Sequence, residues 1–172
     1  MKLSNISVIL GLGVLAVAVP VAVYLSTQQD SLTLRTQAGK DKVAVLYLWP
    51  AAVETAIQEE VAVKVYLTTE DKDSKGVTAK IIYDPQILSL KSIDRGVIFN
   101  KYTERTINEA GGTCTIVAQG NFKGTGTLAT LNFLAKEAGE SSLDVILEDS
   151  QVEDSAGGDI LQGVNGGLVI VN

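Results

Sequence analysis

The most restrictive feature of this chain is an alternation of side chains between positions 60 and 68. Val61, Val63, Val65 and Leu67 fall on one side, with Glu60, Lys64, Tyr66 and Thr68 on the other. Successive side chains of a β-strand point to opposite sides of the sheet, so the pattern predicts a strand with one buried face. Four more inward rows follow the same rule: Val77, Ala79, Ile81 and Tyr83; Ala129, Leu131, Phe133 and Ala135; Leu143, Val145 and Leu147; Leu168 and Ile170.

The remaining residues after position 42 agree with a single all-β domain. Gly-rich and Asp-rich breaks separate the strand-like runs, and no stretch keeps a helical period, although Tyr102–Asn108 has room for one helical turn. About 130 residues are enough for one core. These features predict an antiparallel β-sandwich. Cys114 is the single cysteine, and it alternates with Ile116 and Ala118, so we expect a buried small hydrophobic side chain and no intramolecular disulfide.

The first 25 residues have a different character. No charged residue occurs in 3–29, and the run from Ile6 to Leu25 is almost wholly apolar. A helix of that length spans about 30 Å, the thickness of the hydrocarbon core of a bilayer. A cleaved signal peptide is the alternative, but its apolar core is normally about 7–15 residues long. We therefore expect a transmembrane signal-anchor helix over 6–25.

The flanks of this segment predict how the chain is organised. Lys2 and the free amino group favour a cytoplasmic N-terminus for residues 1–5, which leaves the rest of the chain outside. Residues 26–42 are polar and lack hydrophobic periodicity, so we expect a stalk there and a sandwich domain over 43–172. The chain is thus expected to be a single-pass protein of the cell membrane with an extracytoplasmic C-terminal domain.

The charge of the outer segment limits its partners. Three of the 14 basic residues and one of the 20 acidic residues lie in 1–40, so 41–172 carries 11 basic and 19 acidic residues, a net charge of −8. An acidic surface repels phosphate backbones and anionic lipid headgroups. Nucleic acid is therefore not an expected partner, and the membrane is expected to be contacted through the N-terminal helix.

Several short sequence pieces, in order, resemble the cohesin domain of the cohesin and carbohydrate-binding superfamily. They cover nearly all of 43–172: Leu46–Pro50, Glu60–Val65, Gly76–Pro85 with its Tyr-Asp-Pro ending, Leu88–Leu90, Gly124–Phe133 with its Gly-x-Gly start, Ala138–Gly139 and Gly166–Val171. The resemblance implies a jelly-roll sandwich of about nine strands. It also implies a non-catalytic receptor that binds dockerin modules and so docks other proteins at a scaffold or cell surface.

The resemblance places the binding face on the sheet that contains the Tyr-Asp-Pro strand. From that motif only Asp84 is carried over as a partner contact. The alternation along the same strand turns Lys80 and Ile82 outward as well. If the 142–148 strand lies beside it, Asp144 and Ile146 share that surface. For the 113–119 strand the alternation exposes Val117 and Gln119, whereas alignment with the family favours the opposite face. The protein-binding candidates are Lys80, Ile82, Asp84, Val117, Gln119, Asp144 and Ile146.

Two other functions stay open at this point. Tyr47, Trp49 and Tyr66 have outward parity on expected neighbouring strands, and aromatic rings that lie in one plane bind sugars by stacking. This trio makes the domain a candidate carbohydrate-binding surface module with a polysaccharide partner. A third candidate is a structural cell-envelope or adhesion subunit that associates with itself through an unpaired edge strand or through the anchor.

Enzymatic and metal functions find little support in the composition. The chain has no histidine, which excludes a Ser-His-Asp triad and histidine-ligated metal sites. Two acidic clusters lack the ligand spacing of a calcium loop and are expected to be solvated loops. They are Glu70, Asp71 and Asp73, and Glu148, Asp149, Glu153, Asp154 and Asp159. We expect no catalytic residue, no metal site and no cofactor.

Overall fold

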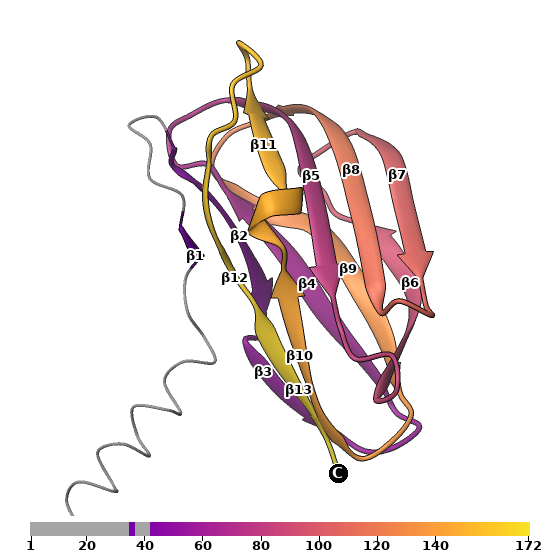
Figure 1. The fold of residues 1–172 in the computed structure, drawn as a ribbon. Helices are drawn as coiled ribbons and strands as arrows, with labels where there is room; N and C mark the ends of the chain where they lie inside the picture. Colours follow the sequence, from indigo (N-terminus) through magenta and orange to yellow (C-terminus); the bar gives the residue numbers. More distant parts are fainter. Residues whose placement is uncertain (1–34, 37–41) are drawn as a thin grey trace, which may run out of the picture. The chain divides into compact units, whose positions relative to one another are not determined.

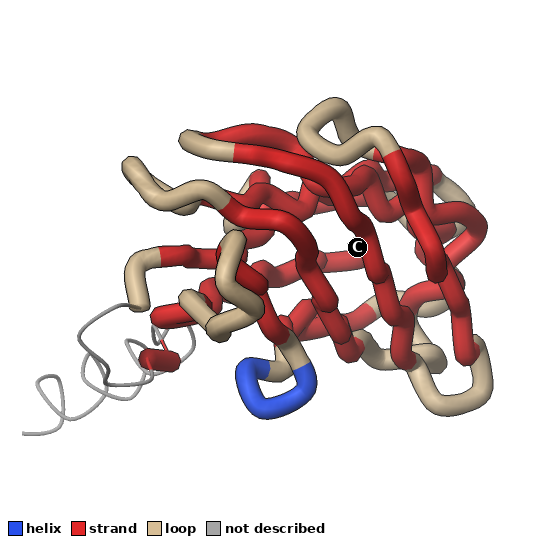
Figure 2. The backbone as a smooth tube through the Cα atoms, turned by 90° about the horizontal axis from the view of Figure 1, so that it is seen from above, coloured by secondary structure: helices blue, strands red, loops and turns tan. Residues whose placement is uncertain are grey.

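The computed structural model describes residues 35–36 and 42–172, and it contains two β-sheets that pack face to face (Figures 1 and 2). The six-stranded sheet has the strand order β1 (Arg35–Thr36), β12 (Leu161–Asn165), β2 (Ala44–Trp49), β4 (Glu60–Thr68), β9 (Thr125–Ala135) and β6 (Leu88–Arg95). The seven-stranded sheet has the order β3 (Ala52–Thr55), β13 (Gly167–Val171), β10 (Gly139–Val145), β5 (Ser74–Ile82), β8 (Thr113–Phe122) and β7 (Lys101–Asn108); β11 (Gln151–Asp154) also pairs with β5. A short 3-10 turn, η2 (Leu147–Asp149), separates β10 from β11.

The core lies between the inward faces of these sheets, where the sequence pattern places it. In β4 the burial alternates residue by residue, and Val63, Val65 and Leu67 are almost fully buried. The inward rows of β5, β9 and β10 are buried in the same way. Because apolar burial is the main favourable term in folding, these rows account for the sandwich. The prediction of an all-β sandwich is confirmed.

The last strand contradicts the predicted side-chain direction. Val169 and Val171 of β13 are buried, whereas Leu168 and Ile170 are only partly buried and face the outside of the seven-stranded sheet. Residues 168–171 are all apolar, so no polar side chain in the sequence marks the solvent side. A shift of one residue then exchanges the two faces of a strand without changing the pattern.

The sheets are mixed, which corrects the prediction of a purely antiparallel sandwich of about nine strands. β2 and β12 pair in parallel in one sheet, and β3 and β13 pair in parallel in the other. The segment that forms β2 and β3 and the segment that forms β12 and β13 each pass from one sheet to the other. The first changes sheets at Pro50, after a cis peptide bond, and the second at Gly166. Each long segment therefore supplies two short strands, and the strand number exceeds nine. Alternation reveals where strands occur, but it carries no information about their partners.

The helical turn allowed for Tyr102–Asn108 is not formed. The segment is β7, an edge strand of the seven-stranded sheet, and nearly all of its residues are exposed. Since an exposed edge strand has little apolar periodicity, its sequence gives a weak strand signal. A register shift between Tyr102 and Glu104 and the charged residues along β7 are features that protect natural sheet edges from further pairing.

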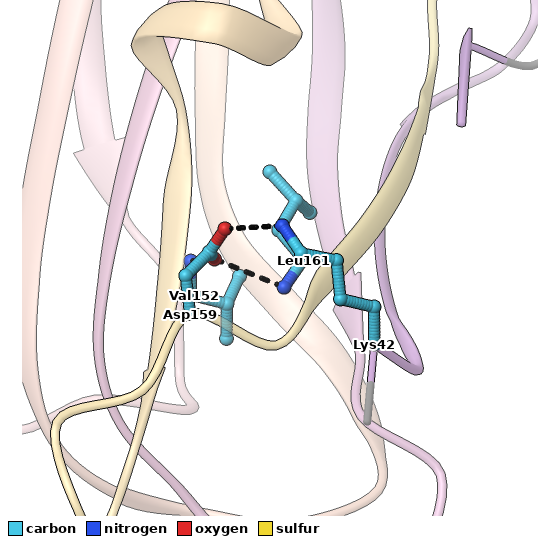
Figure 3. A network of polar contacts seen from close by, with 4 residues as sticks. All are labelled: Lys42, Val152, Asp159 and Leu161. Carbon is cyan, nitrogen blue, oxygen red and sulfur yellow. Dashed lines mark hydrogen bonds and ion pairs between the residues drawn. The ribbon is translucent and has the colours of Figure 1, made fainter. Parts of the chain in front are cut away.

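The beginning of the domain is fixed to its C-terminal part. β1 pairs with Val164 and Gly163 of β12. Lys42 donates a hydrogen bond from Nζ to Oδ2 of Asp159 at 2.6 Å, and Oδ1 of the same carboxylate accepts from the backbone N–H groups of Val152 and Leu161 (Figure 3). The expected anchor helix over 6–25 and most of the expected stalk lie outside the described residues. Within the described part, no helix is long and apolar enough to cross a membrane.

The Asp159 network gives a prediction for stability and its pH dependence. Partial burial raises the pKa of Asp159, but the hydrogen bonds from Lys42, Leu161 and Val152 outweigh it, and the net pKa is lowered. A lowered pKa in the folded state means full stabilisation above about pH 4, lost as the pH falls through the lowered value. We expect Asp159→Ala to reduce the free energy of unfolding by about 2 kcal/mol at pH 7, measured by urea denaturation.

A second substitution separates the ion pair from the backbone contacts. Asp159→Asn keeps the oxygen that accepts both N–H groups but loses the charge, so about half of that loss is expected at pH 7 and a smaller loss at pH 3. Asp71→Asn serves as a matched control because Asp71 is fully exposed, 3.7 Å from Lys123. An equal effect of Asp159→Asn at both pH values would contradict this assignment.

Candidate functional site

The outward side of the seven-stranded sheet brings most of the predicted protein-binding residues together. Ile82 of β5 lies opposite Asp144 of β10 on one side and opposite Thr113 of β8 on the other. Two residues before Ile82 on β5, Lys80 pairs with Thr115. The next outward pair is Thr78 with Val117. We call this surface the β5–β8–β10 face and define it by Lys80, Ile82, Val117, Gln119 and Asp144.

The side-chain direction of β8 follows the alternation and not the alternative from family alignment. Cys114, Ile116 and Ala118 are almost fully buried. Val117 is therefore outward and half-buried, and Gln119 is outward and exposed. The apolar side chains of Ile82 and Val117 thus lie on the outside of two adjacent central strands.

Lys80 is the charged centre of this face. Its Nζ lies 2.8 Å from Oδ2 of Asp149 in η2, and its backbone N–H donates to the Ser150 hydroxyl. Ile146 precedes η2, outside β10, and its N–H donates to the carbonyl of Lys80. The predicted neighbourhood of Ile146 and β5 is present, but Ile146 belongs to the turn after the strand.

Asp84 lies beyond the end of β5 and its carboxylate already has a local role. Its Oδ1 accepts a hydrogen bond from the backbone N–H of Gln86 at 2.8 Å, and its own N–H donates to the Ser141 hydroxyl. This arrangement is a side-chain turn of the kind that Asp commonly forms. Within the described residues, Asp84 acts as a turn residue at the rim of the β5–β8–β10 face.

The adjoining Tyr83 is also engaged in structure. Its hydroxyl donates to Oε2 of Glu109 at 2.8 Å, and the N–H of Leu90 donates to the same oxygen. Burial raises the pKa of Tyr83, and the Glu109 carboxylate raises it further. Burial also raises the pKa of Glu109, but hydrogen bonds from Ser89, Tyr83 and Leu90 bring the net value below its usual range. The hydrogen bonds that Glu109 accepts from Tyr83 and Leu90 therefore connect the end of β5 to β6.

Sequence reasoning missed two apolar residues next to this face. Leu168 and Ile170 of β13 point outward and pair with Ser142 and Glu140 of β10. The apolar run alone does not define a face. The signal that could have identified these two residues is the family motif at 166–171 combined with the turn at Gly166. They extend the partly exposed apolar area from β8 and β5 towards the β13 side of the sheet.

The three predicted glycan-binding aromatics lie on the outward side of the other sheet. Tyr47 of β2 is directly opposite Tyr66 of β4, with ring centroids 5.2 Å apart and an interplanar angle of 9°. Rings at that distance and angle stack on each other, so they do not lie side by side in one plane. Trp49 is 56% exposed, and Lys64 Nζ lies 5.9 Å from its ring centroid. Trp49 is thus the most exposed residue of the trio.

The acidic clusters do not converge. Within 42–172, no group of three or more Asp, Glu, Cys or His side chains is arranged to hold a metal ion. Glu153 and Asp154 belong to β11, which corrects their assignment to a loop. Asp154 Oδ1 accepts hydrogen bonds from the backbone of Ala156 and Gly158, and these contacts lower its pKa. The carboxylate oxygens therefore stabilise a hairpin.

Comparison with known proteins decides the family. The cohesin domain family model matches residues 48–170. The chain belongs to the cohesin family.

Solved cohesins have the same fold. A cohesin in an OlpC cohesin–dockerin complex from Clostridium thermocellum is 14% identical with a TM-score of 0.70, covering 80% of this chain and 99% of that chain. A cohesin from Clostridium acetobutylicum is 19% identical with a TM-score of 0.64, covering 77% and 93%. A non-cellulosomal cohesin from the archaeon Archaeoglobus fulgidus is 14% identical with a TM-score of 0.63, covering 75% and 91%. None of the curated proteins compared with the chain matches it.

The cysteine of this cohesin is predicted to be chemically silent in the folded state. Cys114 is 1% exposed, and burial raises the pKa of its thiol to about 12. Only the thiolate reacts rapidly with a disulfide reagent. We expect no labelling of the native protein at pH 8 and complete labelling after denaturation. An Ala138→Cys variant, with its thiol in an exposed turn, is the positive control; native Cys114 reacting as fast as that thiol would contradict the burial.

Proposed function

We propose that this cohesin binds a dockerin-like protein module non-covalently through the β5–β8–β10 face. One observation carries the proposal: Ile82 and Val117 are partly exposed β-branched side chains on adjacent central strands, beside the Lys80–Asp149 ion pair. Partly exposed apolar side chains interspersed with polar groups are common on protein-binding surfaces. No covalent chemistry is needed for this role, and the chain is proposed to be a non-catalytic receptor.

Relatives of known structure support this choice of partner. Three of the structures similar in fold are described as cohesin–dockerin complexes, two from Clostridium thermocellum and one from Acetivibrio cellulolyticus. Their identities to this chain are between 12% and 16%, so the partner does not transfer with the fold. What supports the transfer is the pair of partly exposed apolar side chains, Ile82 and Val117, on the outward face of this chain.

The test is a binding assay on the full chain against a panel of dockerin modules, including those of the three complexes, with calcium and with a chelator. The same chain is run on a polysaccharide array. We expect at least one dockerin to bind with a dissociation constant that rises when Ile82 is changed, and no loss of binding with Trp49→Ala. If only a polysaccharide is retained, and Trp49→Ala abolishes the retention, the protein-receptor function is wrong.

A carbohydrate-binding function is the second candidate, favoured by the exposure of Trp49. Against it stands the stacking of Tyr47 on Tyr66, because stacked rings do not form the flat platform on which a sugar packs. The polysaccharide arm of the assay decides between the two functions.

We further propose that residues 6–25 anchor the domain at the outer face of the cell membrane, with residues 1–5 in the cytoplasm. The support is the uncharged apolar run and the position of Lys2. The chain should stay with membranes on alkaline extraction, and an external protease should reach the sandwich in intact cells. Val14→Arg, which places a charge in the apolar run, should release it; an unchanged membrane fraction would contradict the anchor.

A further inference from the structure

Gly76 leaves a gap in the outward row of side chains on β5. Its neighbours across the sheet are Gln119 of β8 and Glu153 of β11, and both point to the same side. The gap is a hollow of about 80 Å³. It is lined by Gly76, Val77, Thr78, Val117, Ala118, Gln119, Gln151 and Glu153. The hollow therefore adjoins the β5–β8–β10 face and shares Val117 and Gln119 with it.

The rim of the hollow offers hydrogen-bonding groups that the described part of the chain does not use. Gln119, Gln151 and Glu153 make no side-chain hydrogen bond or ion pair within residues 35–36 and 42–172, whereas Lys80 on the same face is already paired with Asp149. Among the described residues that line the hollow, Glu153 is the only charged one. One carboxylate and two amide oxygens therefore surround a space without a side chain.

Charges of both signs lie near the hollow, including Lys75 beside Gly76 on β5, and the one charge among its described lining residues, on Glu153, favours a cationic occupant. Glu104 of β7 lies opposite Val117, one row away from the hollow. Lys101 of β7 pairs with Gln119 of β8. Glu153 belongs to β11, on the other side of β5, so the two charges lie at opposite ends of this row of paired residues. The carboxylate at the hollow thus has no cation beside it among the lining residues. A lysine or arginine head with several N–H donors matches one carboxylate and two amide oxygens.

We infer that this hollow receives one lysine or arginine side chain of the protein partner. The stem of that side chain passes over Val117 and Thr78, and its charged head donates to Glu153 with Gln119 and Gln151 on either side. The inference rests on the proposed function and adds the chemistry of the contact that selects the partner. Truncation of one member of a charged hydrogen-bonded pair at an interface typically weakens binding by tenfold or more.

Substitutions at two positions test the hollow without disturbing the fold. A Cβ atom at Gly76 would lie 3.5 Å from the Ala118 carbonyl oxygen and 3.6 Å from Glu153 Oε2, which are ordinary contacts. Gly76→Ala and Gly76→Val are therefore expected to fold and to fill the hollow progressively, which unchanged melting temperatures would verify. Glu153→Gln removes the charge alone. Glu140→Gln is the matched control, since Glu140 is also exposed on the outward side of this sheet, on β10.

The probe is a phage-displayed library of the dockerin modules from the three complexes, with their surface positions varied, selected on the full wild-type chain. We expect the selected binders to carry a lysine or arginine that they require. Their affinity should fall about tenfold with Glu153→Gln, further with Gly76→Val, and not with Glu140→Gln. Selection on Glu153→Lys should instead yield an acidic residue at that contact.

Two outcomes overturn the inference in different ways. Binders that lose affinity with a change at Ile82 but not with Gly76→Val or Glu153→Gln leave the proposed function intact and exclude the hollow. The absence of any binder that depends on the β5–β8–β10 face removes the proposed function and the hollow together.

Discussion

Replacement of Phe133 by alanine is expected to lower the free energy of unfolding by about 3–5 kcal/mol, the largest stability effect in this domain. Phe133 is fully buried on β9, between β4 and β6. Its ring meets that of Tyr83 from the facing sheet, with centroids 5.2 Å apart and an angle of 71°. Truncation removes this edge-to-face contact and leaves a cavity between two sheets that cannot fully collapse.

Urea denaturation of wild type and variant measures the loss. Phe122→Ala is the matched control because Phe122 is a half-buried aromatic whose ring lies 5.9 Å from that of Phe99 at the margin of the core. We expect Phe122→Ala to cost no more than about half as much, since less of its surface is removed from water. Equal losses from the two variants would mean that Phe133 does not occupy the centre of the core.

The largest effect on binding is expected from Ile82→Arg. Ile82 lies between Asp144 and Thr113 on the β5–β8–β10 face, and an arginine there would place a bulky, hydrated cation where the partner packs. Apolar residues packed in an interface contribute up to about 2 kcal/mol or more, so the dissociation constant should rise at least about thirtyfold. The domain itself should stay folded, because Asp144 lies directly opposite and can pair with the new charge.

Leu134→Arg is a closely matched control for this variant. Leu134 is also half-buried and outward, but it lies on β9 in the other sheet, and its cross-strand neighbour Glu60 provides the same kind of carboxylate. Titration of a selected dockerin by calorimetry should show weakened binding for Ile82→Arg only. Comparable weakening by Leu134→Arg would place the contact on the wrong sheet or indicate a global effect.

The sequence predicted side-chain directions wherever polar residues mark the outside of a strand. In β4 the outward residues Glu60, Lys64 and Thr68 are polar, and the predicted face is the observed one. In β8 two faces stayed open, and the structure follows the alternation. In β13 every residue from 168 to 171 is apolar, and the prediction chose the wrong face. In β7 both faces are exposed, so the pattern carries little information.

The candidate site was only partly accessible to sequence reasoning. Lys80, Ile82 and Asp144 could be placed on one surface from parity and one assumed strand pairing, which β10 and β5 confirm. The turn role of Asp84 depends on a local hydrogen bond that a motif does not reveal. The hollow at Gly76 depends on the pairing of β5 with β11, two segments about 75 positions apart. Long-range register of this kind is a property of the folded chain.

An NMR map of the contact would locate the partner on this domain residue by residue. The backbone amide signals of the full chain are followed while an unlabelled, selected dockerin is added, and cross-saturation identifies the residues in contact. We expect the affected amides to lie on β5, β8, β10 and β11, around Ile82, Val117 and Gly76. Affected amides concentrated on β2 and β4, around Trp49, with β5 and β8 unchanged, would contradict it.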